Sequence, residues 1–259
     1  MNLLTDIHSH LEHDYFKKDL DKVIDNAKNS GFKAIITAGI NPETNRKALE
    51  LSKKYEIVEC SLGVYPRSAL KREVEGSVFP LKLEEFDIND ETKFIKSNKD
   101  NILAIGEIGL DFVKVRDELQ INDFKAMLKL AEELKKPVII HSRKAEQECI
   151  EILESSKLKK VIMHCFNGKK KLVKRIQDNG WFFSIPAIIV RSQQFQEIVK
   201  DVPLSQLFTE SDAPYLSPFK EKRNEPAFIT ETIKKIAEIK GMDEKEVVNN
   251  VYMNWQKVF

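Results

Sequence analysis

The sequence contains little cysteine, little glycine and almost no net charge. Its three cysteines, Cys60, Cys149 and Cys165, are odd in number and far apart in a chain of 259 residues. This pattern argues against a disulfide framework and favours a reducing compartment. Lys and Arg total 42 while Asp and Glu total 41, which leaves a net charge of +1. No overall field therefore favours nucleic acid or an anionic membrane, and any such binding has to be local.

The sequence also lacks an apolar run long enough to span a bilayer. The longest one, from Trp181 to Val190, includes Ser184 and Pro186 and has about half the required length. Asp6 interrupts the first apolar stretch too early for a signal peptide, so we expect none. These absences predict a cytoplasmic globular protein without a membrane partner.

Short apolar runs alternate with longer stretches along the whole chain. Apolar residues make up 42% of the sequence and charged residues 32%, and 15 Phe can fill a sizeable core, so the composition excludes a disordered chain. The apolar runs are nearly continuous, as in strands that are buried on both faces. The predicted strands are 3–8, 34–38, 57–64, 102–108, 137–141, 160–164, 181–185 and 206–209.

The stretches between these runs carry apolar residues at helical spacing. Gly31 can end the first of these helices, and Pro42 can start the second. The segment 67–100 instead predicts a long loop with a short helix. The predicted helices are 19–30, 42–55, 120–135, 145–155, 169–179, 192–200 and 227–240.

Eight strands alternating with helices predict an α/β fold, a (β/α)8 TIM barrel that forms a single domain over residues 1–259. A doubly wound open sheet is the alternative. No Gly-x-Gly-x-x-Gly follows the first strand, however, so its nucleotide-binding version has no support. In a TIM barrel the reactive side chains lie at the C-terminal ends of the strands, where the loops form the active face.

Four of the five histidines occupy such strand ends, together with acidic residues. A single histidine there is more often a hydrogen-bonded polar residue than a ligand, but a group on several strands favours a metal site. His8 and His10 are two residues apart, so in an extended chain both imidazoles point to the same side. Imidazole and carboxylate ligands suit Zn, Mn, Co or Fe and, with more water, Mg. The candidate groups are the histidines His8, His10, His141 and His164 and the acids Asp6, Glu107, Glu210 and Asp212.

The motifs around these residues resemble the TatD family of metal-dependent deoxyribonucleases, in order and in spacing, from residue 3 to about residue 256. The resemblance implies a barrel of the amidohydrolase-like group with a two-metal site, which hydrolyses phosphodiesters, often from a DNA 3′ end. The matching motifs are Asp6-Ile-His-Ser-His-Leu11, Gly106-Glu-Ile-Gly-Leu-Asp111, His141-Ser-Arg143, His164-Cys-Phe166, Glu210-Ser-Asp-Ala-Pro214 and Arg223-Asn-Glu-Pro226.

The same resemblance implies two divalent metal ions, Mg, Mn or Zn, with Glu107 as the bridging ligand. The ligands of one ion would be His8, His10, Glu107 and Asp212. The ligands of the other would be Glu107, His141 and His164.

Two blocks depart from the family pattern. Gly63-Val-Tyr65-Pro66-Arg67 stands where many members have Gly-x-His-Pro-His. Both histidines are missing there, which puts the substrate contacts of that block in doubt, although Tyr65 and Arg67 can still reach a phosphate. Glu210-Ser-Asp212 replaces the usual Glu-Thr-Asp and keeps a hydroxyl between the acids.

Glu107 and Asp212 are the predicted catalytic residues. Glu107 would fix the separation of the two ions, and Asp212 would accept the proton of the attacking water. Glu210 is predicted to orient a ligand imidazole, whereas Asp111 and His13 receive no definite role. Paired N–H donors suit phosphate, but each arginine can equally form a structural ion pair. The candidates for binding the substrate phosphate are Tyr65, Arg143 and Arg223.

The partner expected from this reading is DNA, with no protein partner, for a monomer or weak oligomer. The basic run 169–171, with Lys174 and Arg175, either contacts a DNA backbone or forms a solvated helix face. Two alternatives stay open. One is a barrel hydrolase of the same group that acts on a small non-nucleic ester, amide or phosphoester, which the altered block at Tyr65 allows. The other is a non-catalytic scaffold that binds nucleic acid or protein.

Overall fold

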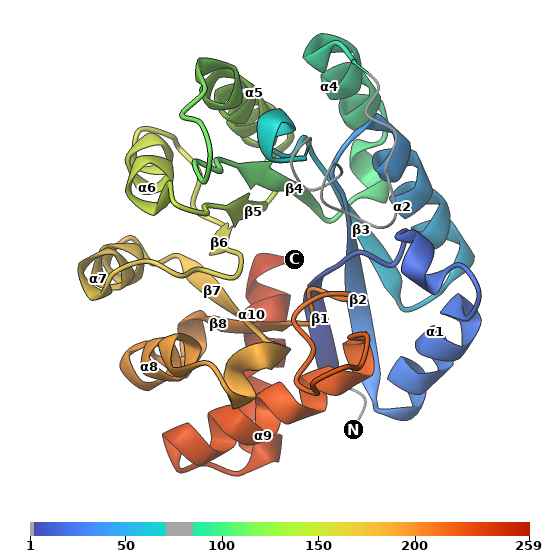
Figure 1. The fold of residues 1–259 in the computed structure, drawn as a ribbon, viewed down its shortest axis with the longest axis vertical. Helices are drawn as coiled ribbons and strands as arrows, with labels where there is room; N and C mark the ends of the chain where they lie inside the picture. Colours follow the sequence, from blue (N-terminus) through green and yellow to red (C-terminus); the bar gives the residue numbers. More distant parts are fainter. Residues whose placement is uncertain (1–2, 71–84) are drawn as a thin grey trace.

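Eight parallel strands pair in the order of the sequence to form the sheet at the centre of the protein. The structure is a computed structural model that describes residues 3–70 and 85–259. Figure 1 shows these strands arranged as a ring. Their bounds are β1 Leu4–Ser9, β2 Phe32–Gly39, β3 Val58–Leu62, β4 Ala104–Gly109, β5 Val138–His141, β6 Val161–Met163, β7 Phe182–Pro186 and β8 Leu207–Glu210.

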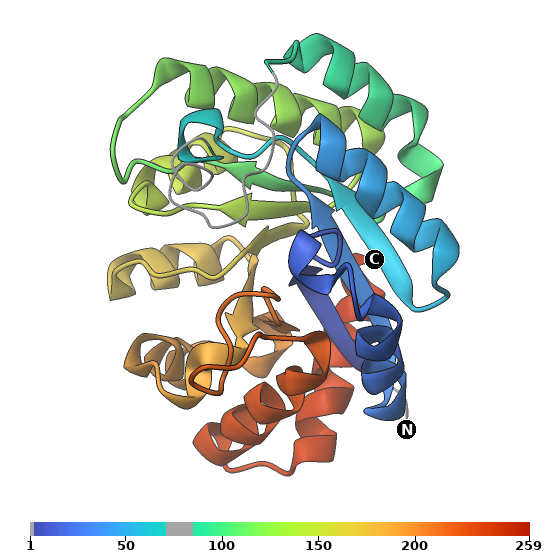
Figure 2. The ribbon, with the colours of Figure 1, turned by 45° about the vertical axis from the view of Figure 1, so that its right-hand side comes forward.

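Helices cover the outside of this ring (Figure 2). Asn41 caps the start of α2 by accepting the N–H of Thr44, and Pro42 occupies the first turn as the sequence predicts. None of the helices in the described ranges has the length and apolar character needed to cross a bilayer. Their bounds are α1 Leu20–Asn29, α2 Pro42–Lys54, α4 Ile88–Ser97, α5 Glu118–Leu134, α6 Glu146–Glu154, α7 Lys170–Asp178, α8 Gln193–Asp201, α9 Ile229–Lys240 and α10 Glu244–Val258.

The ring is closed between β8 and β1 by side-chain hydrogen bonds. The Thr209 hydroxyl donates to the carbonyl oxygen of Thr5 over 2.8 Å. The buried Asp6 carboxylate accepts the backbone N–H of Ser211 at 2.9 Å and its hydroxyl at 2.6 Å. These bonds hold the chain that follows β8 beside the end of β1, where His8 lies.

The lower end of the barrel is filled by apolar side chains and closed by the C-terminal helix. Phe182 and Phe208, near the starts of β7 and β8, pack with their ring centroids 5.2 Å apart. Val258 belongs to the same buried cluster, with Trp255 and Phe259 packed against it. Because this end is apolar and filled, polar groups inside the barrel can face solvent only at the opposite end, where the strands finish.

The predicted (β/α)8 barrel is confirmed, with each predicted strand overlapping an observed one. Trp181, Phe182 and Phe183 are buried in the apolar core. The short helix expected within 67–100 corresponds to α4, although part of that segment, residues 71–84, lies outside the described residues. The prediction missed α10, whose apolar positions Val247 and Val251 pack into the core.

Gly109 allows β4 and β5 to approach closely at the upper end. Its φ is +147°, and a Cβ atom at this position would lie 1.9 Å from the carbonyl oxygen of His141. The amide of the next residue, Leu110, donates to that same oxygen over 3.1 Å. Glycine is required both by the backbone conformation and by the space, and the contact places Glu107 on β4 next to His141 on β5.

Gly109→Ala should therefore lower the free energy of unfolding by about 3 kcal/mol, the sum of backbone strain and a steric clash with β5. Gly180→Ala is the matched control, because φ there is +70° but no atom lies within 4 Å of the added Cβ. Gly180→Ala should lower the free energy of unfolding by only about 1–2 kcal/mol, because it adds backbone strain but no steric clash. Urea unfolding measures both, and equal losses would show that the contact with His141 carries no energy.

Candidate metal centre

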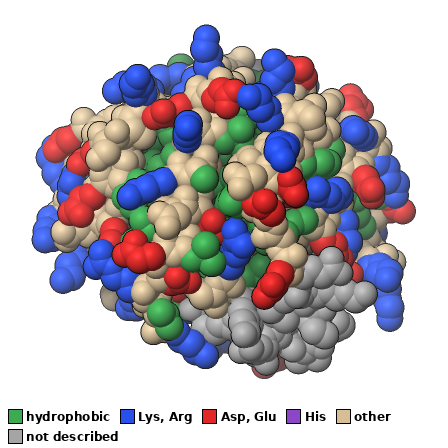
Figure 3. All heavy atoms as spheres, turned by 90° about the horizontal axis from the view of Figure 1, so that it is seen from above, with side chains coloured by type: hydrophobic (Ala, Val, Ile, Leu, Met, Phe, Trp, Pro, Cys, Tyr) green, Lys and Arg blue, Asp and Glu red, His purple; other side chains and the backbone are tan. Residues whose placement is uncertain are grey.

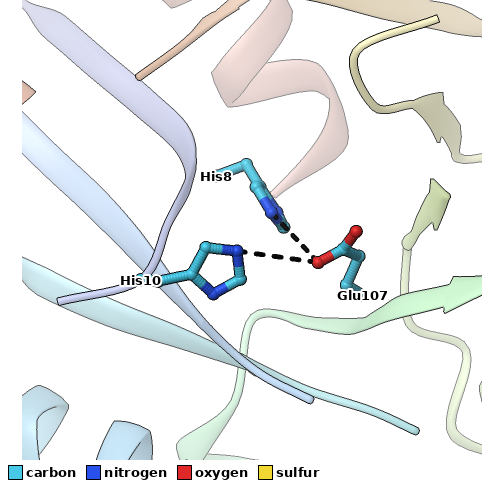
Figure 4. A group of neighbouring side chains, drawn as sticks. All are labelled: His8, His10 and Glu107. Carbon is cyan, nitrogen blue, oxygen red and sulfur yellow. Dashed lines mark ion pairs between the residues drawn. The ribbon is translucent and has the colours of Figure 1, made fainter. Parts of the chain in front are cut away.

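Two imidazoles from the end of β1 point at one carboxylate oxygen from β4. His8 Nε2 lies 3.4 Å and His10 Nε2 lies 3.7 Å from Oε2 of Glu107. Figure 4 shows both rings directed at this oxygen. The two histidines share a side because they are two residues apart along extended chain, so the spacing argument from the sequence agrees with the geometry.

Asp212, two residues beyond β8, reaches the same two rings. Its Oδ1 lies 3.7 Å from Nε2 of His8 and 3.6 Å from Nε2 of His10. Its backbone N–H donates to the carbonyl oxygen of His8 over 2.9 Å, which fixes the residue against β1. The Asp212 side chain is 15% exposed, against 5% for Glu107, so this carboxylate faces the solvent side of the cluster.

The other oxygen of Glu107 faces the remaining two histidines. Oε1 lies 2.9 Å from Nδ1 of His141 at the end of β5, and 3.7 Å from Nε2 of His164 just past β6. Glu107 thus presents one oxygen to the pair His8 and His10 and the other to the pair His141 and His164. The candidate ligands are therefore grouped around both oxygens of this carboxylate.

The surroundings of His8 test whether the residues present fit a cation. Its side chain is fully buried, and neither ring nitrogen has a hydrogen-bond partner among the described residues. A buried polar group left unpaired is costly. Two ligand atoms that each lie about 2.1 Å from one ion are about 3.0–3.4 Å apart, close to the 3.4 Å between His8 and Glu107. The donor set and its spacing therefore fit divalent cations.

Three groups of side chains satisfy the distance criterion for holding an ion, with their ligand atoms within 4.8 Å of one another. Together they contain all six candidate ligands from the sequence. The groups are His8, His10 and Glu107; His8, His164 and Asp212; and Glu107, His141 and His164.

Glu210 lies directly behind His164. Its Oε2 is 2.7 Å from Nδ1 of His164, and it also accepts the hydroxyl of Ser184 on β7. Its Oε1 accepts the backbone N–H of Cys165 over 3.0 Å. This carboxylate orients the imidazole and leaves Nε2 directed at the cluster, which is the arrangement predicted for Glu210 from the sequence.

Two further carboxylates behind the ligands received no role in the sequence analysis. Glu12 Oε1 lies 3.3 Å from Nδ1 of His10, and the Thr37 hydroxyl holds the other oxygen of Glu12 at 2.7 Å. Asp111 Oδ2 lies 3.3 Å from Nε2 of His141. The role of Glu12 could have been predicted from its position two residues after His10. The role of Asp111 could have been predicted from its place in the motif that begins at Gly106.

These outer carboxylates control the protonation of the imidazoles. Burial alone would lower the pKa of His10, but the hydrogen bond and the charge of Glu12 outweigh it and raise the pKa to about 9. Burial acts in the same way on His164, where the charge and hydrogen bond of Glu210 raise the pKa to about 10. Both rings therefore hold a proton at neutral pH in the metal-free protein.

The pKa values of the three side chains nearer the centre, His8, Asp212 and Glu107, shift in different directions. Burial and the charge of His164 lower the pKa of His8 to about 4, so this ring is neutral. Burial raises the pKa of Asp212 to about 7, against the opposing charges of His164 and His10. Burial also opposes ionisation of Glu107, but the surrounding imidazoles hold its pKa well below its usual value.

The cluster lies on the wall of a cavity of about 880 Å³ at the upper end of the barrel. Tyr65 and Arg143 both line this cavity. The Tyr65 hydroxyl lies 3.3 Å from Nε2 of His141. The Arg143 side chain is exposed, and within the described ranges it forms no ion pair. Both residues are placed where a substrate phosphate could reach them.

The structure does not bring the other two candidate arginines to the cavity. Arg223 pairs with both oxygens of Asp19 at 2.9 and 2.7 Å and donates to the carbonyl oxygen of Tyr15. Arg67 pairs with Asp123 at 2.7 and 3.1 Å. Neither is among the residues that line the cavity. Arg223 thus forms the structural ion pair that the sequence left open as its alternative, and Arg67, which was expected to be able to reach a phosphate, is paired with Asp123 instead.

The basic run on α7 also has acidic neighbours. Lys170 lies 2.8 Å from Asp201, and Arg175 pairs with Glu154. On the face drawn in Figure 3, Lys and Arg side chains are interspersed with Asp and Glu. The ion pairs of Lys170 and Arg175 on α7 correspond to the solvated helix face, the second of the two interpretations.

Comparison with known proteins places the chain in a family. The sequence profile described as TatD related DNase matches residues 5–259. Deoxyribonuclease TATDN3 of Homo sapiens is 35% identical over 264 residues, which cover 99% of this chain and 94% of that protein. The 3'-5' ssDNA/RNA exonuclease TatD of Erwinia tasmaniensis is 31% identical over 268 residues, with 98% of each chain covered.

A structural neighbour agrees with the fold. The TatD homologue YjjV of Escherichia coli has a TM-score of 0.86 at 23% identity, and the match covers 100% of this chain and 99% of that chain.

A further sequence relative is an uncharacterized metal-dependent hydrolase of Methanocaldococcus jannaschii. It is 36% identical over 254 residues, with 98% of this chain and 96% of that protein covered.

Binding of a divalent cation should release protons, because only neutral imidazole coordinates a metal while His10 and His164 are protonated in the metal-free protein. The affinity for Mn²⁺ should consequently rise between about pH 6 and pH 8, by up to about tenfold per pH unit for each proton released. Calorimetric titration in two buffers with different ionisation enthalpies counts these protons.

His13→Ala is the control for this titration, because His13 lies outside the three ligand groups and its loss should leave proton release unchanged. His164→Ala should remove one released proton and weaken binding. Equal heats in the two buffers for the wild-type protein would contradict the assignment of protonated imidazoles.

Proposed function

Because the chain belongs to the TatD related DNase family, we propose that it is a metal-dependent deoxyribonuclease that hydrolyses phosphodiester bonds. One observation carries this proposal: the Glu107 carboxylate lies between two pairs of imidazoles on the wall of an open cavity of about 880 Å³. Hydrolysis of a phosphodiester needs charge neutralisation at two oxygens, which cations held by this carboxylate and the imidazoles would supply.

The proposed cofactors are two divalent ions, Mg, Mn or Zn. His8, His10, Glu107 and Asp212 would hold one, and Glu107, His141 and His164 the other. When bound, these ions supply Lewis acidity and make water a stronger nucleophile at neutral pH. The mixed imidazole and carboxylate set accepts several first-row metals, so availability rather than geometry would select among them.

Asp212 is the proposed proton acceptor. Its carboxylate is the more exposed of the two central acids and lines the cavity, so it can reach a water molecule on the substrate side. A carboxylate within hydrogen-bond reach of that water can accept its proton. Its contact with His8 through the backbone keeps the carboxylate in place during the transfer.

Arg143 and Tyr65 are the proposed contacts to the substrate phosphate. The exposed guanidinium of Arg143 offers paired donors at the edge of the cavity. Tyr65 lies deeper, and its hydroxyl is near His141, so it can donate to a phosphate oxygen close to the cluster. These two residues would replace the contacts made by the histidines that this sequence lacks.

We further propose attack at a 3′ end of single-stranded DNA, as the name of the Erwinia relative suggests for that protein. The three free thiols, Cys60, Cys149 and Cys165, support a cytoplasmic location, where thiols stay reduced. If the protein hydrolyses a small ester or amide but not DNA, the alternative of a small-molecule hydrolase is supported.

The test is release of nucleotides from end-labelled single-stranded DNA with Mg²⁺ or Mn²⁺, and its loss with a chelator. Asp212→Asn should lower kcat by about 10²–10⁴-fold, since it removes both a ligand and the proton acceptor. Asp90→Asn is the control, an acid-to-amide change at an exposed position on α4. Full activity of Asp212→Asn, or turnover of esters but not DNA by the wild type, would refute the proposal.

Arg143→Met should raise KM for DNA roughly tenfold with little change in kcat, because it removes a charge-assisted contact to the substrate that is the same in ground and transition states. Arg175→Met on α7 is the matched control, since Arg175 already pairs with Glu154 outside the cavity. Its KM should equal that of the wild type. If Arg175→Met raised KM and Arg143→Met did not, the DNA contact would lie on the basic run of α7 and not at Arg143.

A further inference from the structure

An aromatic cluster occupies one side of the cavity rim. Tyr215, three residues after Asp212, lines the cavity and keeps 49% of its surface exposed. Its ring centroid lies 5.9 Å from that of His13 and 6.2 Å from that of His10. His13 stacks on Tyr15, with centroids 4.8 Å apart and planes at 13°. Tyr215 is exposed and lines the cavity, so its ring presents a flat apolar face to whatever enters it, whereas Tyr15 does not line the cavity and contacts His13 by stacking.

The loops that carry these rings are fastened to each other. Arg223 joins the chain after β8 to the chain after β1 through Asp19 and the carbonyl oxygen of Tyr15. Asn224 donates its side-chain amide to the carbonyl oxygen of Ser211 at 2.6 Å, and its backbone N–H to that of Pro214 at 3.1 Å. The motif that begins at Arg223 therefore holds Tyr215 beside His13 without touching the cavity itself.

The opposite side of the rim is cationic. Arg143 and Lys144 follow β5 and line the cavity with exposed side chains. The strand order places β5 across the ring from β1 (Figure 1). The cavity thus has aromatic rings on one side, the carboxylate and imidazole cluster in the middle and exposed cationic side chains on the other side.

We propose that Tyr215, with the stacked pair His13 and Tyr15, forms a subsite for the nucleobase next to the scissile phosphate. This inference rests on the proposed phosphodiesterase function and gives it a specificity. An unpaired base stacks on an aromatic ring whatever its identity, whereas a base inside a duplex keeps its own neighbours. The strand would pass from the rings, over the cluster, to Arg143 and Lys144, so the site selects single-stranded or frayed ends without reading sequence.

The test is a double comparison of binding, independent of turnover. The probes are short fluorescent single-stranded oligonucleotides with Mg²⁺, whose terminal linkage is a methylphosphonate that resists hydrolysis. Each probe carries either a normal or an abasic terminal nucleotide, at the 3′ end in one set and at the 5′ end in the other. For the wild type, removal of the base at one of the two ends should raise Kd roughly fivefold or more.

Tyr215→Leu, which keeps apolar bulk but removes the ring, should abolish this preference for the base, and Tyr215→Phe should retain it. Phe219→Leu is the control, because Phe219 is an exposed ring of the same loop that packs on Phe228 and does not line the cavity. It should retain the preference. Equal Kd values for both probes with the wild type, no binding of either probe, or an unchanged preference in Tyr215→Leu would each overturn the subsite.

The same proteins are then assayed for cleavage of an unmodified oligonucleotide. If the protein prefers the probe with a base, and this preference depends on Tyr215, but the oligonucleotide is not cleaved, the subsite is supported and the phosphodiesterase function is refuted. Cleavage without base preference would refute the subsite alone.

Discussion

The carboxylate of Glu107 sets the geometry of the whole upper end of the barrel. It is buried, it stays ionised because imidazoles surround it, and its two oxygens face different pairs of histidines. Such a group cannot be compensated by hydrogen bonds alone, since His8 beside it has no partner for either ring nitrogen among the described residues. The cations proposed for this centre would give both the carboxylate and His8 a partner.

Outside this centre, each of three ligand imidazoles is backed by a second carboxylate. Glu12 lies behind His10, Asp111 behind His141 and Glu210 behind His164. These acids come from different loops and strands, so the barrel has to bring its strand ends into register before any of the contacts form. The orientation of the metal ligands is consequently a property of the fold, and a loop in isolation could not provide it.

Much of this was accessible from the sequence. Continuous apolar runs predicted the buried strands, and histidines at the ends of these runs predicted the cluster. Both predictions were possible because each pattern lies within a short stretch of sequence. The contacts of Arg223 with Asp19 and of Arg67 with Asp123 join residues far apart in the chain, and no local pattern distinguishes a paired arginine from a free one. Helix α10 was missed although its apolar spacing was present, and Asp111 had no role until His141 was seen beside it.

The central claim is that Glu107 bridges two cations. The most direct measurement is anomalous X-ray diffraction from crystals of the protein grown with Mn²⁺. The account predicts two anomalous peaks on opposite oxygens of Glu107, one among His8, His10 and Asp212 and the other between His141 and His164. A single peak, or peaks away from Glu107 in a crystal with full Mn²⁺ occupancy, would contradict it.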